Sequence, residues 1–256
     1  MRTRRAIAIL LVTLGLWPAS LHAQSEALID AYRQGEALKE AGRYKQAEQF
    51  YREALGLGER EFGPDDPNTA TLLNNLAELY KAQGRYEAAE PLYKRALAIM
   101  EKSLGPEHHN VGMSLNNLAE LYRVQSRYEA AEPLYERALD ILEKDPGPDD
   151  PIFALSLNNL ALLYQAQGHY EAAEPFLKQA LAILEENLGS EHHNVALTLN
   201  NLAELYRAQA RYKAAEPLYR RALAILEKTL GPNHPNVTSR RCSAISAVST
   251  ICKADT

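Results

Sequence analysis

The chain has 256 residues, a formal net charge of −5, 46 % apolar residues and 7 % aromatic residues. This composition is typical of a folded soluble or repeat protein and excludes wholesale disorder. The acidic balance argues against nucleic acid as a partner, because neutralising phosphate supplies most non-specific affinity. Two cysteines are too few for a disulfide framework or a four-thiolate zinc site.

The segment Met1–Ala23 has the pattern of a secretory signal peptide. Three arginines among the first five residues precede an uncharged run over residues 6–17, and a small residue stands at the cleavage position. The run is shorter than the roughly 20 apolar residues of a membrane span, although an uncleaved anchor is the alternative. Removing the segment would change the net charge from −5 to −8. We therefore expect a mature chain outside the cytoplasm, most simply in a bacterial periplasm, with only transient membrane contact.

The remainder of the chain repeats itself every 42 residues. Residues 68–109 and 194–235 are identical at 31 of 42 positions. The phrase LNNLAELY, or LNNLALLY in one copy, marks four repeats at Leu73–Tyr80, Leu115–Tyr122, Leu157–Tyr164 and Leu199–Tyr206. The region 24–235 therefore divides into five predicted repeats, at about 26–67, 68–109, 110–151, 152–193 and 194–235.

Each repeat is predicted to form two helices. Apolar residues recur with helical spacing in the first helix, at Leu73, Leu76, Ala77 and Tyr80. They do so again in the second, at Tyr86, Ala89, Tyr93, Ala96 and Leu97. Gly84 separates the two helices, and Asp66-Pro67 is a good start for the first. Since neither helix can bury its apolar face alone, neighbouring repeats must stack.

A proline lies after the first turn of the second helix in four of the five repeats, at Pro91, Pro133, Pro175 and Pro217. Proline there removes one backbone hydrogen bond, so we interpret it as a device that curves the helix and shapes the superhelix.

These residues resemble the tetratricopeptide repeat, whose pattern is matched at Leu73, Leu76, Ala77, Tyr80, Gly84, Tyr86, Ala89, Tyr93 and Ala96. The 42-residue period and the phrases LNNLA, RYEAAEPLYKRAL and LGPEHH are similar to the kinesin light chain variant of that repeat. The resemblance implies an all-α fold, a right-handed α-solenoid of stacked antiparallel helix pairs. It also implies a concave groove lined by the first helices, which binds a peptide or protein.

One flank of the first helices is the candidate binding surface. Asn74, Glu78 and Lys81 share this flank at i, i+4 and i+7, whereas Asn75 lies on the other flank and is expected to meet a neighbouring helix. The residues equivalent to Asn74 in the next three repeats extend it into an asparagine row, Asn74, Asn116, Asn158 and Asn200. An amide both donates and accepts hydrogen bonds, and the resemblance implies that this row holds the main chain of a bound peptide. The alternatives are that each asparagine joins neighbouring helices or faces water.

Charged rows flank the asparagines and complete the predicted site with Glu78, Lys81, Glu120, Arg123, Glu204 and Arg207. The fourth repeat carries Leu162 and Gln165 instead, an apolar gap that would set side-chain preference. The alternative interpretation of the charged rows is a solvated face whose opposite charges pair with each other.

Other motifs do not point to catalysis or to a cofactor. His108-His109 and His192-His193 are candidate metal ligands, but neighbouring histidines rarely converge on one ion, so we favour a role in loops and helix caps. The sequence has no nucleophile elbow, Gly-rich phosphate loop or HExxH motif. We therefore predict a protein with no catalytic residues, no metal and no cofactor.

The repeat pattern stops after Val237. The segment 236–256 is predicted to be either a short amphipathic helix that caps the last repeat or a frayed tail. Two hypotheses for function follow from the whole sequence. The first is a periplasmic adaptor that holds an extended peptide or partner segment. The second is a structural component that oligomerises through the solenoid ends, and an accessory subunit of an extracytoplasmic enzyme is a variant of the first.

Overall fold

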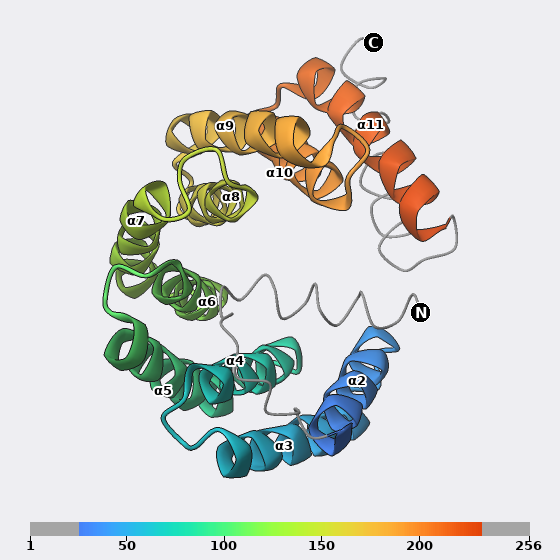
Figure 1. Cartoon of the computed structure of the whole chain (residues 1–256). Helices are drawn as coiled ribbons and strands as arrows, with labels where there is room; N and C mark the ends of the chain where they lie inside the picture. Colours follow the sequence, from blue (N-terminus) through green and yellow to red (C-terminus); the bar gives the residue numbers. More distant parts are fainter. Residues whose placement is uncertain (1–25, 232–256) are drawn as a thin grey trace. The chain divides into compact units, whose positions relative to one another are not determined.

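The computed structural model describes residues 26–231, and the regular elements in this range are ten α-helices (Figure 1). They are α2 (Glu26–Glu40), α3 (Tyr44–Glu61), α4 (Pro67–Ala82), α5 (Tyr86–Leu104), α6 (His109–Val124), α7 (Tyr128–Lys144), α8 (Pro151–Ala166), α9 (Tyr170–Leu188), α10 (His193–Ala208) and α11 (Tyr212–Leu230). The predicted signal peptide and the segment 236–256 lie outside the described residues.

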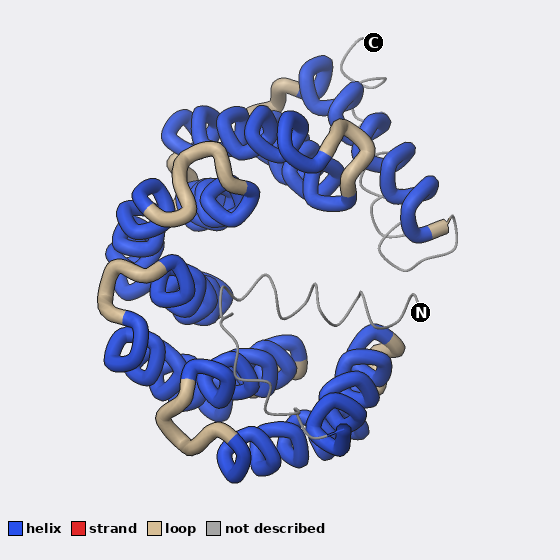
Figure 2. The backbone as a smooth tube through the Cα atoms, viewed as in Figure 1, coloured by secondary structure: helices blue, strands red, loops and turns tan. Residues whose placement is uncertain are grey.

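The chain divides into two compact units, with the boundary inside α6 between Ser114 and Leu115. In the first unit α2 packs on α3, α3 on α4 and α4 on α5. In the second unit α7 packs on α8, α8 on α9, α9 on α10 and α10 on α11, and α8 also contacts α10. Short loops join the helices (Figure 2). The prediction of an all-α fold built from stacked helix pairs is confirmed.

The turn inside each pair ends the first helix with a residue in the left-handed backbone region. Gly84 has φ of +70°, and the N–H of the next residue, Arg85, donates to the carbonyl of Tyr80 at 2.9 Å. The closing bond of 6→1 type satisfies a carbonyl that the helix end would leave without a partner. Glycine reaches this conformation without the steric cost of a side chain, which explains why Gly84 separates the predicted helices.

Polar side chains start the first helices. The carboxylate of Asp66 accepts from the N–H of Asn68 at 2.8 Å, and that of Asp150 accepts from the N–H of Ile152 at 2.7 Å. In α10 the Nδ1 atom of His192 does the same, accepting from the N–H of Asn194 at 3.1 Å. The interpretation of this histidine as a cap is therefore confirmed.

The core lies between the helices of a pair and between successive pairs. Leu73 and Ala77 of α4 and Tyr93 and Ala96 of α5 are all fully buried, as the helical spacing predicts. The small alanines allow the helices to approach closely, and each large buried side chain contributes about 1.5–3 kcal/mol to folding. Of the helices described, none is long and apolar enough to cross a membrane.

Candidate functional site

The asparagine row lies where successive first helices meet. In the first unit Asn74 of α4 is half-buried, and its Nδ2 atom donates to Ser114 Oγ at 3.4 Å. In the second unit Asn158 and Asn200 are buried, with 8 % and 9 % of their surface exposed. Asn158 Oδ1 accepts from Nδ2 of Asn201 on α10 at 3.0 Å. At Asn74 and Asn158 the structure shows the interhelical contacts that were the alternative interpretation.

Part of the hydrogen-bonding capacity of the row is unused. The Oδ1 atoms of Asn74 and Asn116 are buried and accept no hydrogen bond within the described part of the chain. A buried acceptor without a donor costs about 1–3 kcal/mol. Each of these oxygens would gain a donor from a ligand only when its amide turns toward the helix surface, whereas Asn158 already has a partner. The prediction that the row contacts a peptide stays a prediction.

The second asparagine of the pair faces the preceding repeat at Asn75, as expected, and at Asn201. The Nδ2 atom of Asn75 donates to the hydroxyl of Tyr32 on α2 at 3.5 Å, and Asn201 bonds Asn158 in the same direction. These bonds link the first helices of consecutive repeats, α2 to α4 and α8 to α10.

The charged rows pair with themselves. Lys81 Nζ lies 2.7 Å from Glu78, Arg123 lies 2.7 Å from Glu120, and Arg207 lies 2.7 Å from Glu204, all at i, i+3. The side chains of the first two pairs are half-buried, and Arg207 is more exposed, so the pairs satisfy each other's charges locally. Contact of these side chains with a ligand also stays a prediction.

The glutamates have a second role that the sequence pattern alone does not predict. The hydroxyl of Tyr93, a fully buried residue of α5, donates to Glu78 Oε2 at 2.9 Å. Tyr135 of α7 donates to Glu120 Oε2 at 2.9 Å in the same way, and Tyr51 donates to Glu36 in the first repeat. Burial, and then the charge of Glu120, raise the pKa of the Tyr135 phenol well above its usual value. Each glutamate thus accepts the polar end of an otherwise buried ring.

The fourth repeat lacks both members of this pair. Leu162 stands in the position of the glutamate, and the fully buried Leu177 stands in that of the tyrosine. The joint replacement is visible in the sequence and could have revealed the pairing. The third substituted residue, Gln165, donates from Nε2 to the carbonyl of Asn201 at 3.1 Å, so it connects α8 to α10.

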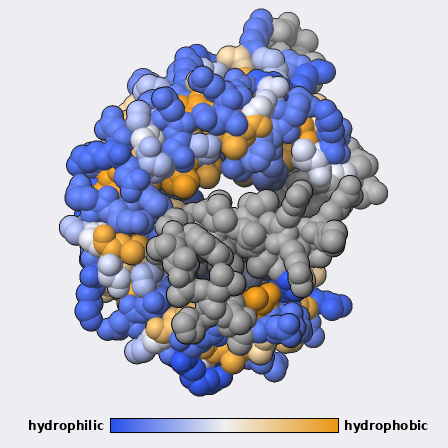
Figure 3. Space-filling view, viewed as in Figure 1, coloured by the Kyte–Doolittle hydropathy of each residue, from blue (hydrophilic) through white to orange (hydrophobic). Residues whose placement is uncertain are grey.

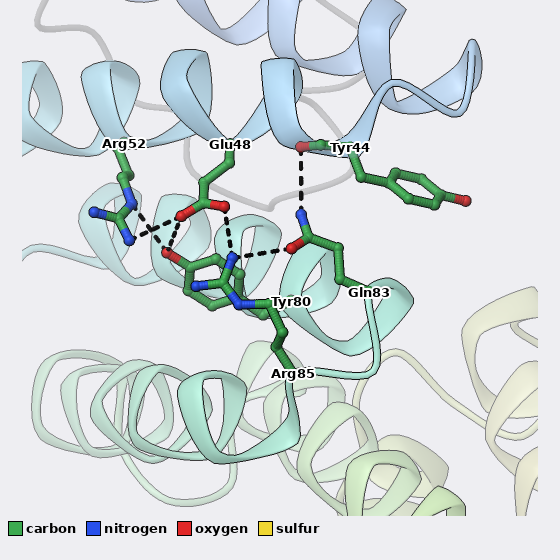
Figure 4. A network of polar contacts seen from close by, with 6 residues as sticks. All are labelled: Tyr44, Glu48, Arg52, Tyr80, Gln83 and Arg85. Carbon is green, nitrogen blue, oxygen red and sulfur yellow. Dashed lines mark hydrogen bonds and ion pairs between the residues drawn. The ribbon is translucent and has the colours of Figure 1, made fainter.

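A second polar network joins a second helix to the next first helix at two places, α3 to α4 and α9 to α10. Glu48 of α3 accepts from the Tyr80 hydroxyl at 3.1 Å and from Arg85 at 2.6 Å, and Arg52 lies 2.8 Å from the same carboxylate (Figure 4). The Arg85 guanidinium also stacks on the Tyr80 ring, 4.3 Å from its centroid. We call this group the Glu–Tyr–Arg clasp.

The clasp recurs in the second unit. Glu174 accepts from the Tyr206 hydroxyl at 2.9 Å and from Arg211 at 2.6 Å, and Lys178 lies 2.7 Å away. Burial opposes the charge on Glu174, but the hydrogen bonds from Lys178, Arg211 and Tyr206 lower its pKa to about 2. The clasp fastens one repeat to the next and is not a candidate catalytic site.

Pairs of helices stacked in this way, with tyrosines and alanines at fixed positions, define the class of helix-pair repeat proteins. The sequence profile of the tetratricopeptide repeat matches residues 27–102, 70–144, 110–186, 152–228 and 194–240. The chain therefore belongs to the tetratricopeptide repeat family. A comparison with curated protein sequences found no match.

Solved structures support this assignment. BtubC (BKLC) from P. vanneervenii is 26 % identical, with a TM-score of 0.62 and coverage of 83 % of this chain and 91 % of that one. The putative kinesin light chain repeats of Podosopora anserina are 26 % identical, with a TM-score of 0.61 and coverage of 82 % and 99 %. The resemblance to kinesin light chain repeats is confirmed.

A Rap protein complexed with Competence and Sporulation Factor shares the fold at 19 % identity, with a TM-score of 0.68 and coverage of 86 % of this chain and 64 % of that one.

Proposed function

We propose that this protein is a non-catalytic scaffold that binds an extended peptide or partner segment along the first helices of its repeats. The observation that carries the proposal is the partly used asparagine row. Asn74 and Asn116 occupy equivalent positions, and each has a carboxamide oxygen that is buried and accepts no hydrogen bond from the described residues, so a small turn of the amide would let it exchange burial for a ligand donor. An N–H group of a peptide main chain is the donor that such an oxygen lacks, whatever the sequence of the peptide.

Two further observations support binding over catalysis. The family is one of interaction scaffolds, and the two networks described above, the glutamate–tyrosine pairs and the clasps, connect helices to one another. The Rap structure provides a solved example of the same fold in complex with a factor. We also propose that the chain acts outside the cytoplasm, because Met1–Ala23 has the features of a secretory signal.

The test compares two pairs of asparagines that differ only in the flank they occupy. Tagged Gln24–Thr256 is cross-linked in a periplasmic extract, beside the variant Asn74→Ala/Asn116→Ala and the control Asn75→Ala/Asn117→Ala. Circular dichroism establishes that all three fold. We expect a partner captured by the wild type and the control to be lost from the first variant.

Equal capture by all three proteins would contradict binding through the asparagine row. If the tagged protein captures only copies of itself, and its molecular mass in solution rises with concentration, the result would instead favour a structural solenoid that assembles through its ends.

A further inference from the structure

The first helix of the fourth repeat differs from the other first helices in charge. Between Pro151 and Ala166, α8 has no charged residue, whereas α6 and α10 each carry a Glu–Arg pair on the candidate binding flank. Ile152 replaces an asparagine found in the second, third and fifth repeats, Leu162 replaces their glutamate and Gln165 their basic residue. The polar character of the flank is therefore interrupted at one repeat.

Hydrogen bonds place Leu162 beside the seam between α8 and α10. Asn158 and Gln165 lie four residues before and three residues after Leu162, and both bond Asn201 of α10, at 3.0 and 3.1 Å. Leu162 therefore shares a helix flank with two residues that face the same partner. It is only partly buried, as are Ile152 and Leu155, although the latter two also pack against the core of the second unit. The face of the molecule drawn in Figure 3 carries small hydrophobic patches among mainly hydrophilic surface.

The charges at the equivalent positions of α6 and α10 are already neutralised. Arg123 lies 2.7 Å from Glu120 on α6, and Arg207 lies 2.7 Å from Glu204 on α10. A charged side chain brought against α8 would lose water without gaining a counter-ion there, which is costly. An aliphatic side chain would lose only unfavourable hydration. The flank thus rejects charge at this repeat.

We propose that the partly buried apolar flank of α8, formed by Leu162 with Ile152 and Leu155, is a specificity site for one large aliphatic side chain of the bound peptide. The inference rests on the proposed function, because the asparagine row supplies the main-chain contacts that bring the side chain to α8. Burying such a side chain is worth about 1.5–3 kcal/mol. Peptides with leucine, isoleucine or methionine at the corresponding position should therefore bind about tenfold or more tightly than peptides with aspartate or lysine there.

The experiment restores the pattern of the other repeats at α8. The variant Leu162→Glu/Gln165→Arg/Leu177→Tyr supplies the glutamate, its basic partner and the buried tyrosine together, so the net charge does not change. The wild type and this variant are used to select from a phage library of random octapeptides. We expect aliphatic residues to be enriched at one position by the wild type, and this enrichment to fall about tenfold in the variant while binding of the main chain persists.

A reciprocal variant, Glu204→Leu/Arg207→Gln/Tyr219→Leu, moves the apolar pattern onto α10 and should create a second aliphatic preference. Two results would overturn the inference and leave the proposed function intact. One is equal aliphatic enrichment by the wild type and the first variant, and the other is a wild type that selects peptides without any aliphatic preference. If the wild type selects no peptide at all, the proposed function fails and the inference fails with it.

Discussion

At the scale of single residues, two turns hold a non-glycine residue in the left-handed backbone region. Ser126 and Ala210 have φ of 59° and 58°, at positions where the other three repeats have glycine, as at Gly84. This conformation costs a residue with a Cβ atom about 1–2 kcal/mol of stability in the folded state. Glycine avoids that cost, but its greater freedom in the unfolded chain lowers the free energy of unfolding by about 0.4–1 kcal/mol.

Ser126→Gly and Ala210→Gly should therefore each stabilise the protein by about 0.5 kcal/mol, measured by urea unfolding. The reverse change, Gly84→Ala, should destabilise it by a similar amount or more. Unchanged or reduced stability in both glycine variants would show that the turns carry no such strain.

The ionisation of Glu174 makes stability depend on pH. Its pKa is lowered from 4.5 to about 2, because the bonds from Lys178, Arg211 and Tyr206 outweigh its burial. A carboxyl group whose pKa is lower in the folded state stabilises the fold above its ordinary pKa, and the contribution disappears as pH falls through the folded pKa. We expect the loss between about pH 4.5 and pH 2.

Glu174→Gln should remove this part of the acid dependence while keeping an acceptor for the Tyr206 hydroxyl. Thermal melts between pH 7 and pH 2 measure it, with Glu191→Gln, a change at an exposed carboxylate, as the control. Identical pH profiles for the wild type and Glu174→Gln would contradict the assignment.

At the scale of elements, the glutamate and the buried tyrosine of a repeat act as one unit. Glu78→Leu removes the acceptor of the Tyr93 hydroxyl, and Tyr93→Leu removes a donor to Glu78 and leaves space in the core. The fourth repeat carries leucine at both positions. We therefore expect the double variant to be about 1–2 kcal/mol more stable than the sum of the two single changes predicts. Chemical unfolding of the four proteins gives this coupling, and simple additivity would refute the pairing.

A second coupled pair joins α3 to α4. A Cβ atom on Gly58 would lie 2.4 Å from Leu72 Cδ1. In the next three repeats the order of sizes is reversed, with the large residue on the second helix and the small one on the following first helix. The pairs are Met100 with Ser114, Leu142 with Ser156 and Leu184 with Thr198. We interpret the exchange as conservation of volume between neighbouring repeats.

Leu72→Ser alone should cost about 2–4 kcal/mol through the cavity it leaves, and Gly58→Leu alone should cost about 1–3 kcal/mol through overpacking. The double variant Gly58→Leu/Leu72→Ser should recover most of the loss, as measured by thermal unfolding. Losses that add in the double variant would exclude a shared volume.

These pairs also show where sequence analysis reaches its limit. The spacing of Leu73, Leu76 and Ala77 predicts a buried helix face, because a period of 3.6 residues depends only on the helix itself. The same spacing places Asn74 and Glu78 on one flank, but it does not say which neighbouring helix meets that flank. The contact of Glu78 with Tyr93 depends on how two helices pack, and only the joint replacement in the fourth repeat records it in the sequence.

At the scale of the whole molecule, the repeats must reach the compartment in which they act. The described helices account for folding but not for location, and the evidence for location is the segment Met1–Ala23. A charged start followed by a short apolar run is the form that the export machinery recognises and that a peptidase then removes. We expect the full-length chain, expressed in a Gram-negative bacterium, to appear in the periplasmic fraction with Gln24 as its first residue.

N-terminal sequencing and mass spectrometry of the fractions test this expectation. The variant Leu10→Arg/Leu14→Arg interrupts the apolar run and should leave the unprocessed chain in the cytoplasm, because an arginine costs about 2.5–3.5 kcal/mol on insertion. An intact chain that sediments with membranes would mean that the segment is retained as an anchor. Unprocessed wild-type chain in the cytoplasm would contradict export, and with it the periplasmic setting of the proposed binding.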